Sequence, residues 1–237
     1  MPTIVLACPK GGSGKSTSSL VLATQLALNG ADVTLIDADP NKPQSRWARL
    51  PGKPDNLTIV VSTSETTIID DIESAEHSTP FVIVDLEGTA SLLVAYAISR
   101  ADLVIIPTQG SQLDATEAAK AVTLIKQQEK MISKSIPHRI LFTRTSPAIK
   151  PRTLAHIQEQ FRKFHVASLQ THLHEREAFR AIWSFGGTLN SLDPKHVGNI
   201  DSAKANARAL AAEVVKVLQQ LESNKPLSQE KPHEVTV

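Results

Sequence analysis

Residues 8–17 carry the clearest chemical signal in the chain. They read CPKGGSGKST, a glycine-rich turn followed by a lysine and two hydroxyl side chains. Such a turn lets backbone N–H groups surround phosphate oxygens, and the helix that follows adds the positive end of its dipole. Lys15 is placed to reach the β- and γ-phosphates of a nucleotide, and Ser16 to ligate Mg²⁺. We therefore predict a phosphate-binding loop.

This loop departs from the general phosphate-loop pattern at one position. The pattern G-x-x-x-x-G-K-[ST] requires glycine where the chain has Pro9. Residues 10–17 instead fit the variant K-G-G-x-G-K-[ST]-T in full. The alternative is an ordinary turn between a strand and a helix, which does not call for this combination of residues. The predicted nucleotide-binding residues of the loop are Lys10, Gly11, Gly12, Ser13, Gly14, Lys15, Ser16 and Thr17.

Three aspartates follow apolar runs that read as strands. Asp37 and Asp39 come after residues 33–36, and Asp85 comes directly after residues 81–84. In a parallel sheet such strand ends lie beside the phosphate loop. Phosphoryl transfer depends mainly on positioning and charge neutralisation, so these carboxylates would face the lysines of the loop and a divalent cation. The alternative for Asp37 and Asp39 is a solvated turn, since Asp-Pro-Asn is also turn chemistry.

Short β-branched runs alternate with helical patterns along the chain. Most runs are apolar on successive residues, which is typical of strands covered on both faces. The alternation predicts an α/β fold with a doubly wound, mostly parallel sheet flanked by helices. The predicted strands are residues 3–7, 33–36, 57–61, 81–84, 103–106 and 140–143, and the predicted helices are 16–28, 115–134, 151–164 and 201–221.

Several residues mark details of the predicted helices. Asn29 and Gly30 give a signal for the end of the first helix. Asp201 is a candidate cap for the last one. The helix at 151–164 places Leu154, Ile157, Phe161 and Phe164 on one apolar stripe.

Composition sets further bounds. Hydrophobic residues make up 41% of the 237-residue chain, enough for a buried core. The single cysteine, Cys8, cannot form an intramolecular disulfide, which favours a cytoplasmic protein. The N-terminus has no secretory pattern, and no apolar run approaches the ~20 residues that span a bilayer. We expect residues 1–222 to form one domain and residues 223–237 a disordered polar tail.

Residues 10–17 resemble the deviant Walker A loop of the ParA/MinD family of ATPases. Residues 35–40, LIDADP, resemble the D-x-D-P segment of that family; residues 81–85 resemble its Walker B strand and residues 103–107 the strand after it. The resemblance covers about residues 3–222 and is closest to short plasmid-partition ParA proteins that lack an N-terminal helix-turn-helix domain. It implies a P-loop NTPase fold and a slow, partner-stimulated, Mg²⁺-dependent ATP hydrolase.

The resemblance also implies which residues act in catalysis. Lys10 corresponds to the lysine that crosses a dimer interface to the partner's nucleotide, so the homodimer would depend on ATP. Lys15 corresponds to the lysine that holds the phosphates, and Asp39 to the residue that orients the attacking water. The chain departs from common members at Glu87, an added acid that either supports the γ-phosphate region or points away from it.

The metal and base positions carry over in the same way. Ser16 corresponds to the hydroxyl on Mg²⁺, Asp85 to the carboxylate that holds the ion through water, and Asp37 to a group near its water shell. Thr143 and Arg144 occupy the place where many relatives contact adenine through an asparagine and a basic residue.

The net charge of +1 hides an uneven distribution. Residues 120–180 hold 12 basic and 4 acidic side chains, whereas residues 1–119 hold 7 and 14. A basic patch suits contacts to DNA phosphates, which give affinity without sequence information. The alternative is a set of solvated helix faces. The candidate DNA contacts are Lys150, Arg152, Arg162, Lys163, Arg176 and Arg180.

The sequence therefore predicts a ParA-type ATPase that dimerises on ATP, binds DNA non-specifically and drives plasmid or chromosome segregation. The resemblance implies a centromere-binding partner that stimulates hydrolysis, and a nucleoid-associated location without membrane contact. Three alternatives stay open: a MinD-like positioning regulator, a metabolic ATP-dependent ligase on the same fold, and an accessory ATPase of conjugal DNA transfer. Residues 174–179, HEREAF, resemble the last of these.

Overall fold

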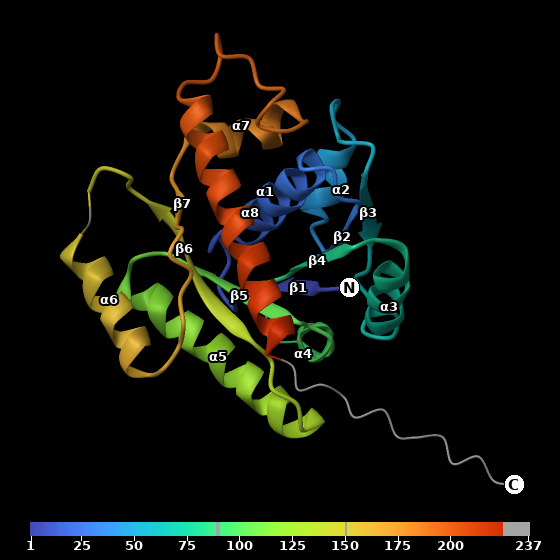
Figure 1. The fold of residues 1–237 in the computed structure, drawn as a ribbon, viewed down its shortest axis with the longest axis vertical. Coiled ribbons are helices and arrows are strands. Elements are labelled where there is room, and N and C mark those ends of the chain that lie inside the picture. Colours follow the sequence, from blue (N-terminus) through green and yellow to red (C-terminus); the bar gives the residue numbers. More distant parts are fainter. Residues whose placement is uncertain (89–90, 150, 225–237) are drawn as a thin grey trace, which may run out of the picture.

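A parallel β-sheet runs through the middle of the molecule (Figure 1). The computed structural model describes residues 1–88, 91–149 and 151–224. Seven strands pair in the order β3-β2-β4-β1-β5-β6-β7, and every pairing is parallel. The predicted α/β class is confirmed. The strands are β1 Thr3–Leu6, β2 Val33–Ala38, β3 Leu57–Val61, β4 Phe81–Leu86, β5 Leu103–Thr108, β6 His138–Thr145 and β7 Leu173–His174.

Helices cover both faces of this sheet because successive strand residues point to opposite sides. Along β1, Ile4 and Leu6 join one apolar cluster and Val5 joins the other. The first cluster is completed by α1, α2, α7 and α8, and the second by α3, α4, α5 and α6. The helices are α1 Lys15–Leu28, α2 Pro43–Ala48, α3 Ile68–Ser78, α4 Leu92–Ser99, α5 Gln112–Ile132, α6 Arg152–Lys163, α7 Glu177–Phe185 and α8 Ile200–Ser223.

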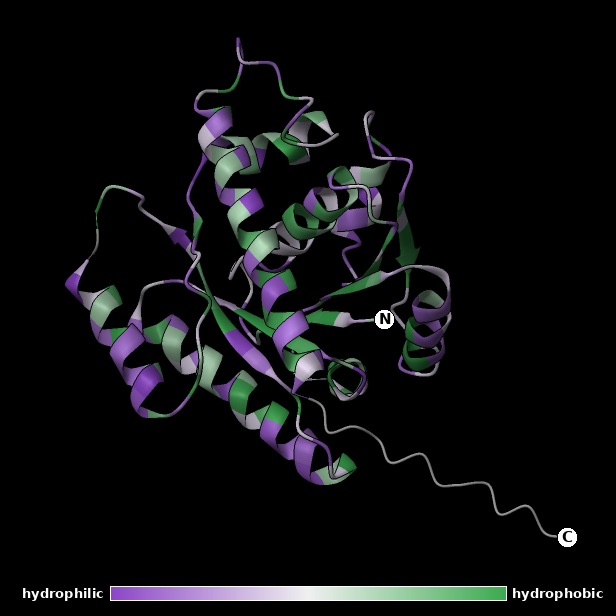
Figure 2. Ribbon diagram, in the orientation of Figure 1, coloured by the Kyte–Doolittle hydropathy of each residue, from purple (hydrophilic) through white to green (hydrophobic). Residues whose placement is uncertain are grey.

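The distribution of hydropathy agrees with this layered arrangement. Figure 2 shows largely apolar strands at the centre, whereas α6 alternates polar and apolar residues along its length. Among the described residues, no helix combines the length and the apolar character that crossing a membrane requires.

The predicted strands all form, but four of them, β2, β4, β5 and β6, run further than expected. β2 continues to Ala38 and β4 to Leu86, so Asp37 and Asp85 lie inside strands rather than after them. The first helix ends as predicted, with Asn29 as its C-cap and Gly30 at φ 90°.

Two predicted helix details are wrong. Asn199, in the left-handed region, caps α8, and Asp201 lies in the first turn instead. Phe164 is not part of the buried stripe of α6, because the helix ends at Lys163 and the Phe164 side chain is 75% exposed. Ser223 is the last residue of α8, so the expected tail begins later than predicted; residues 225–237 lie outside the described residues. The single domain over residues 1–222 stays a prediction.

Candidate nucleotide-binding site

The loop between β1 and α1 takes a backbone shape that requires glycine. Gly12 and Gly14 have φ of 74° and 101°, where other residues are strained. Gly14 is also the N-cap of α1, and a Cβ there would lie 3.2 Å from the Thr143 side chain. The chain can therefore turn tightly into α1 and point successive N–H groups into one concavity, as phosphate binding requires.

Lys15 is held under this loop by the loop's own backbone. Its Nζ donates to the carbonyl oxygens of Cys8 at 3.0 Å and Lys10 at 3.2 Å. Burial lowers the pKa of the Lys15 ammonium, and the Asp85 carboxylate opposes that shift. The chain that follows β4 also lies close to the loop, because a Cβ at Gly88 would be 3.1 Å from the Gly11 nitrogen. The lysine is thus fixed beside the phosphate-binding concavity before any ligand arrives.

Two buried carboxylates lie next to one another at the same edge. Asp37 of β2 and Asp85 of β4 are partners in register, and both are fully buried. Asp37 Oδ2 accepts hydrogen bonds from the Ser45 N and Oγ, each at 2.8 Å. Asp85 accepts from Ser19 Oγ at 3.3 Å and from Ser16. Burial raises the pKa of both carboxyl groups, that of Asp85 to about 6.

This donor set fits a magnesium ion. Mg²⁺ favours carboxylate, hydroxyl and water oxygens, and it keeps several of its waters. Asp37 Oδ1 is a buried acceptor with no hydrogen-bond partner among the described residues. Ser16, in the first turn of α1, hydrogen-bonds Asp85. The three predicted metal residues therefore come together, and one of their oxygens still needs a donor.

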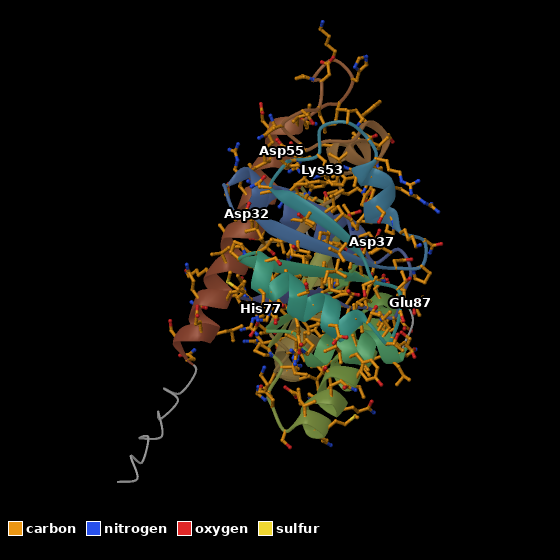
Figure 3. The ribbon with its side chains drawn as sticks, turned by 90° about the vertical axis from the view of Figure 1, so that its right-hand side faces the viewer. Asp32, Asp37, Lys53, Asp55, His77 and Glu87 are labelled. Atoms are coloured by element: carbon orange, nitrogen blue, oxygen red, sulfur yellow. The ribbon has the colours of Figure 1, made fainter. Side chains whose placement is uncertain are left out.

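Asp39 and Glu87 line the opening of the site. A cavity of about 520 Å³ is bounded by the phosphate loop, by Asp39 with Pro40 and Asn41, and by Glu87, Gly88 and Arg144. Asp39 Oδ1 accepts from Asn41 N at 2.8 Å, which holds the carboxylate in a tight turn. Figure 3 shows Asp37 and Glu87 on one side of the molecule, with Asp32, Asp55 and His77 on the other. Glu87 therefore lines the cavity beside the phosphate loop, which is one of the two positions expected for it.

Lys10 takes a position that the sequence did not predict. Its Nζ pairs with Asp114 Oδ1 at 2.5 Å, across to the first turn of α5. The Asp114 side chain is only 5% exposed, and Ser111, the N-cap of α5, donates to its other oxygen. In the single chain, Lys10 is thus held on its own α5. The spacing of Ser111 and Asp114 resembles a capping pair, a signal that could have drawn attention to this aspartate.

A second cavity, of about 290 Å³, adjoins the phosphate loop on the α7 side. Thr143 lies at its base, where Oγ1 donates to the Ser13 carbonyl at 2.7 Å. The Trp183 indole N–H donates to Thr17 Oγ1 at 3.3 Å. Arg144, at φ 51°, borders both cavities. The two predicted base contacts are therefore at the site, but the Thr143 hydroxyl already bonds to the loop. The remaining lining residues include Arg176, Phe179 and Arg180.

The predicted DNA contacts do not form one cluster. Arg152, Arg162 and Lys163 are exposed on α6. Arg176 and Arg180 instead line the second cavity, near the phosphate loop. Lys150 lies outside the described residues.

Comparison with known proteins gives a consistent result. The sequence model of the VirC1 family, described as VirC1 protein, matches residues 1–225. The chain is 41% identical over 218 residues to a protein named ParA from Rhizobium radiobacter, which covers 92% of this chain and 98% of that protein. This relative supports the predicted ParA-type partition ATPase.

Solved structures share the fold. The chain is similar to a putative plasmid partition protein from Borrelia burgdorferi B31 bound to AMPPNP, with a TM-score of 0.66, 19% identity, and coverage of 91% of this chain and 99% of that one. It is also similar to the cell division ATPase MinD from Pyrococcus furiosus, with a TM-score of 0.67, 17% identity and the same coverage. Given the near-complete family match and the ParA relative, this chain belongs to the VirC1 family, which is ParA-like and has the P-loop ATPase fold.

Proposed function

We propose that this protein is a Mg²⁺-dependent ATPase that closes into a homodimer on ATP, binds DNA without sequence preference and uses hydrolysis to segregate DNA. The observation that carries the proposal is the meeting of Lys15, Asp37, Asp39 and Asp85 around one phosphate loop. A lysine beside three carboxylates matches what phosphoryl transfer needs: charge neutralisation, metal binding and a positioned water.

Each residue has a task that follows from its position. The loop N–H groups and Lys15 bind the phosphates, while Ser16, Asp37 and Asp85 would hold Mg²⁺. When bound, the ion neutralises charge on the transferring phosphoryl group. Asp39 lines the open side of the cavity and carries a carboxylate that can orient the attacking water. The fixed geometry places these groups before the reaction begins.

The nucleoside would occupy the second cavity. Thr17, Trp183 and Phe179 border it with apolar and hydroxyl surface suited to a ribose and a flat base. Arg176 Nε is a buried donor with no partner among the described residues. A guanidinium at this position can stack on or hydrogen-bond to a base. This position supports a nucleotide role for Arg176 rather than a DNA role.

DNA would bind through the exposed basic face of α6. Arg152 and Lys163 lie on one side of this helix, and its apolar stripe faces the core. Such contacts go to phosphates and are weakened by salt, because bound DNA releases its counterions. The ATP-closed dimer would double this surface, which links DNA affinity to the nucleotide. A centromere-binding protein would stimulate hydrolysis and reset the cycle in the cytoplasm, at the nucleoid.

The test is DNA binding with ATP, with ADP and without nucleotide. We expect sequence-independent binding with ATP that weakens steeply as salt rises. The variant R152E/K163E should bind DNA more weakly while its nucleotide affinity is unchanged. The control K195E/K216E reverses two exposed basic residues on the opposite layer and should bind like the wild type. Indifference to nucleotide would contradict the switch and favour a phosphoryl-transfer enzyme on the same fold.

A second candidate is an accessory ATPase of conjugal DNA transfer. Residues 174–179 carry the resemblance to that branch, and four of them line the second cavity: His174, Glu175, Arg176 and Phe179. Both candidates predict ATP-dependent DNA binding, so the cargo distinguishes them. Deleting the gene should raise plasmid loss if the protein partitions DNA, and should lower transfer frequency with normal plasmid retention if it serves conjugation.

A further inference from the structure

Gln44 is a fully buried residue at the metal side of the site that no motif singled out. It lies in the first turn of α2, two residues after the N-cap Lys42. Its Nε2 donates to Asp85 Oδ2 at 2.8 Å and to the Ser16 carbonyl oxygen at 3.0 Å. One side-chain amide therefore joins α2, the Walker B strand β4 and the start of α1.

The orientation of this amide is fixed by its partners. The Asp85 carboxylate oxygen and the Ser16 carbonyl can accept but not donate, so the NH₂ group of Gln44 must face them. The opposite orientation would place three acceptor oxygens together. The carbonyl oxygen Oε1 must then point away from both. It is buried, and it has no hydrogen-bond partner among the described residues.

A second acceptor at this edge of the sheet also needs a donor. Asp37 Oδ1 is buried with no hydrogen-bond partner in the described part of the chain, while Ser45 donates to the other Asp37 oxygen. Gln44 and Ser45 are adjacent in α2, and Asp37 and Asp85 are adjacent in the sheet. Buried acceptors without donors are costly, so a site with two of them is incomplete. A hydrated cation would supply strong O–H donors to both.

We propose that Gln44 is a positioning residue for the hydrated Mg²⁺ ion, with Oε1 accepting a hydrogen bond from one of its waters. Its Nε2 meanwhile holds Asp85 and the Ser16 backbone in place. This inference rests on the proposed Mg²⁺-nucleotide function and adds a residue to it. Side chains that orient metal-bound groups in this way change metal affinity by about 10- to 100-fold when they are removed.

The test compares nucleotide release with and without Mg²⁺. The variant Q44M keeps the length of the side chain and removes its polar atoms. Dissociation of a fluorescent ADP analogue is measured at about pH 8.5, well above the pKa of Asp85, so that the carboxylate is ionised. We expect Mg²⁺ to slow release at least ten-fold less in Q44M than in the wild type, with Mg²⁺-free affinity within about two-fold.

Two further variants separate the role of Oε1 from structural effects. Q25M makes the same change at another buried glutamine, which bonds to Asn29 at the far end of α1, and should keep the full Mg²⁺ effect. Q44N keeps the amide but shortens the side chain by one CH₂ group, so its oxygen is withdrawn from the metal waters; it should lose the Mg²⁺ effect as Q44M does. Q44N also tests the inference if Q44M does not fold.

The outcomes are distinct. If Q44M loses Mg²⁺-free and Mg²⁺-bound affinity equally, or keeps the whole Mg²⁺ effect, Gln44 only supports the loop and the inference is wrong. The inference is also wrong if Q44N keeps the whole Mg²⁺ effect, because the position of Oε1 is then irrelevant. If the wild type itself binds nucleotide no better with Mg²⁺, the proposed function fails, and the role of Gln44 fails with it.

Discussion

Replacing Asp114 with asparagine should make the ATP-dependent dimer tighter. In the single chain the Lys10 ammonium is paired with the Asp114 carboxylate at 2.5 Å. If Lys10 crosses to the partner's nucleotide, as its match to the ParA/MinD loop implies, this pair must break first. The contact therefore stabilises the open monomer and opposes closure. Asparagine keeps the size of the side chain but removes the charge that holds the lysine.

The size of the expected change in dimer affinity follows from the surroundings of the ion pair. Lys10 is 39% exposed, which places the pair towards the range of about 0.2–1 kcal/mol for solvent-exposed ion pairs. Asp114 is nearly buried, and hydrogen bonds to charged groups contribute about 1.5–3 kcal/mol. We take about 1 kcal/mol for each protomer, a factor of about five. A symmetric dimer breaks two such pairs, so its dissociation constant should fall by about 25- to 30-fold.

Sedimentation velocity with a non-hydrolysable ATP analogue measures this constant directly. Asp114→Asn also touches the cap of α5, so S111A is the matched control. S111A removes the capping hydroxyl, costs about 1 kcal/mol of stability and leaves the ion pair in place. Its dimer constant should stay within about two-fold of the wild type while its Tm falls.

Two results would refute the reasoning. A dimer of D114N that is no tighter than that of the wild type would show that the ion pair does not oppose closure. A K10A/D114N double variant that dimerises on ATP as tightly as D114N would show that the effect does not pass through Lys10. Either result would leave the contact as a structural ion pair.

The other predictions concern single positions in the site. K10A should keep nucleotide affinity and lose ATP-dependent dimers by light scattering; surviving dimers would contradict its role. D39A should accumulate the ATP-bound dimer with at least ten-fold slower phosphate release, and unchanged turnover would remove Asp39 from the mechanism. G14A should cost about 1–3 kcal/mol by thermal unfolding, because φ is 101° and Thr143 is 3.2 Å away; an unchanged Tm would contradict that strain. Burial raises the pKa of Asp85 from 3.8 to about 6, so the nucleotide-free protein should lose stability as pH rises from about 4 to 6 and stay level above. Mg²⁺ binding should weaken below about pH 6, and D85N should reduce the trend in unfolding free energy to the part that the raised pKa of Asp37 contributes; an undiminished trend in D85N would assign it to another group.

Long apolar runs made the sheet predictable, and short or featureless segments did not reveal their helices. β3 was located to the residue because five β-branched or apolar side chains stand together. α4, LLVAYAIS, has almost no polar residue to set a helical period. α2 is six residues long and starts from Lys42 in the left-handed region. Such helices depend on tertiary packing more than on local propensity.

The strand ends show a related limit. A charged side chain is normally a sign that a strand has ended, since burying it is costly. β2 continues through Asp37 because Ser45 satisfies one of its oxygens, and β4 continues through Asp85 because Gln44 and Ser19 do the same. Those compensating donors come from other elements, so no local pattern reveals them.

Some residues of the candidate site could likewise be predicted from local sequence, and others could not. The phosphate loop is a local motif, so its residues could be found from spacing alone. Gln44, Asp114 and Trp183 meet it through hydrogen bonds that span 28, 104 and 166 residues of sequence. These three residues lie near the loop because the fold brings α2, α5 and α7 to the carboxyl edge of the sheet.

The basic segment shows why charge density along a chain is an incomplete guide to a DNA surface. Counting placed six residues in one candidate patch, but Arg176 and Arg180 line the second cavity, whereas Arg152 and Lys163 lie on the exposed face of α6. Arg180 is further compensated by ion pairs with Glu175 and Glu177. A phosphate contact needs a cation that is free to approach solvent-exposed DNA. Charge reversal on α6 should therefore lower DNA affinity and its salt dependence, whereas changes at Arg176 should act first on nucleotide binding. If R176A lost DNA binding but kept full nucleotide affinity, the assignment of Arg176 to nucleotide binding would be wrong.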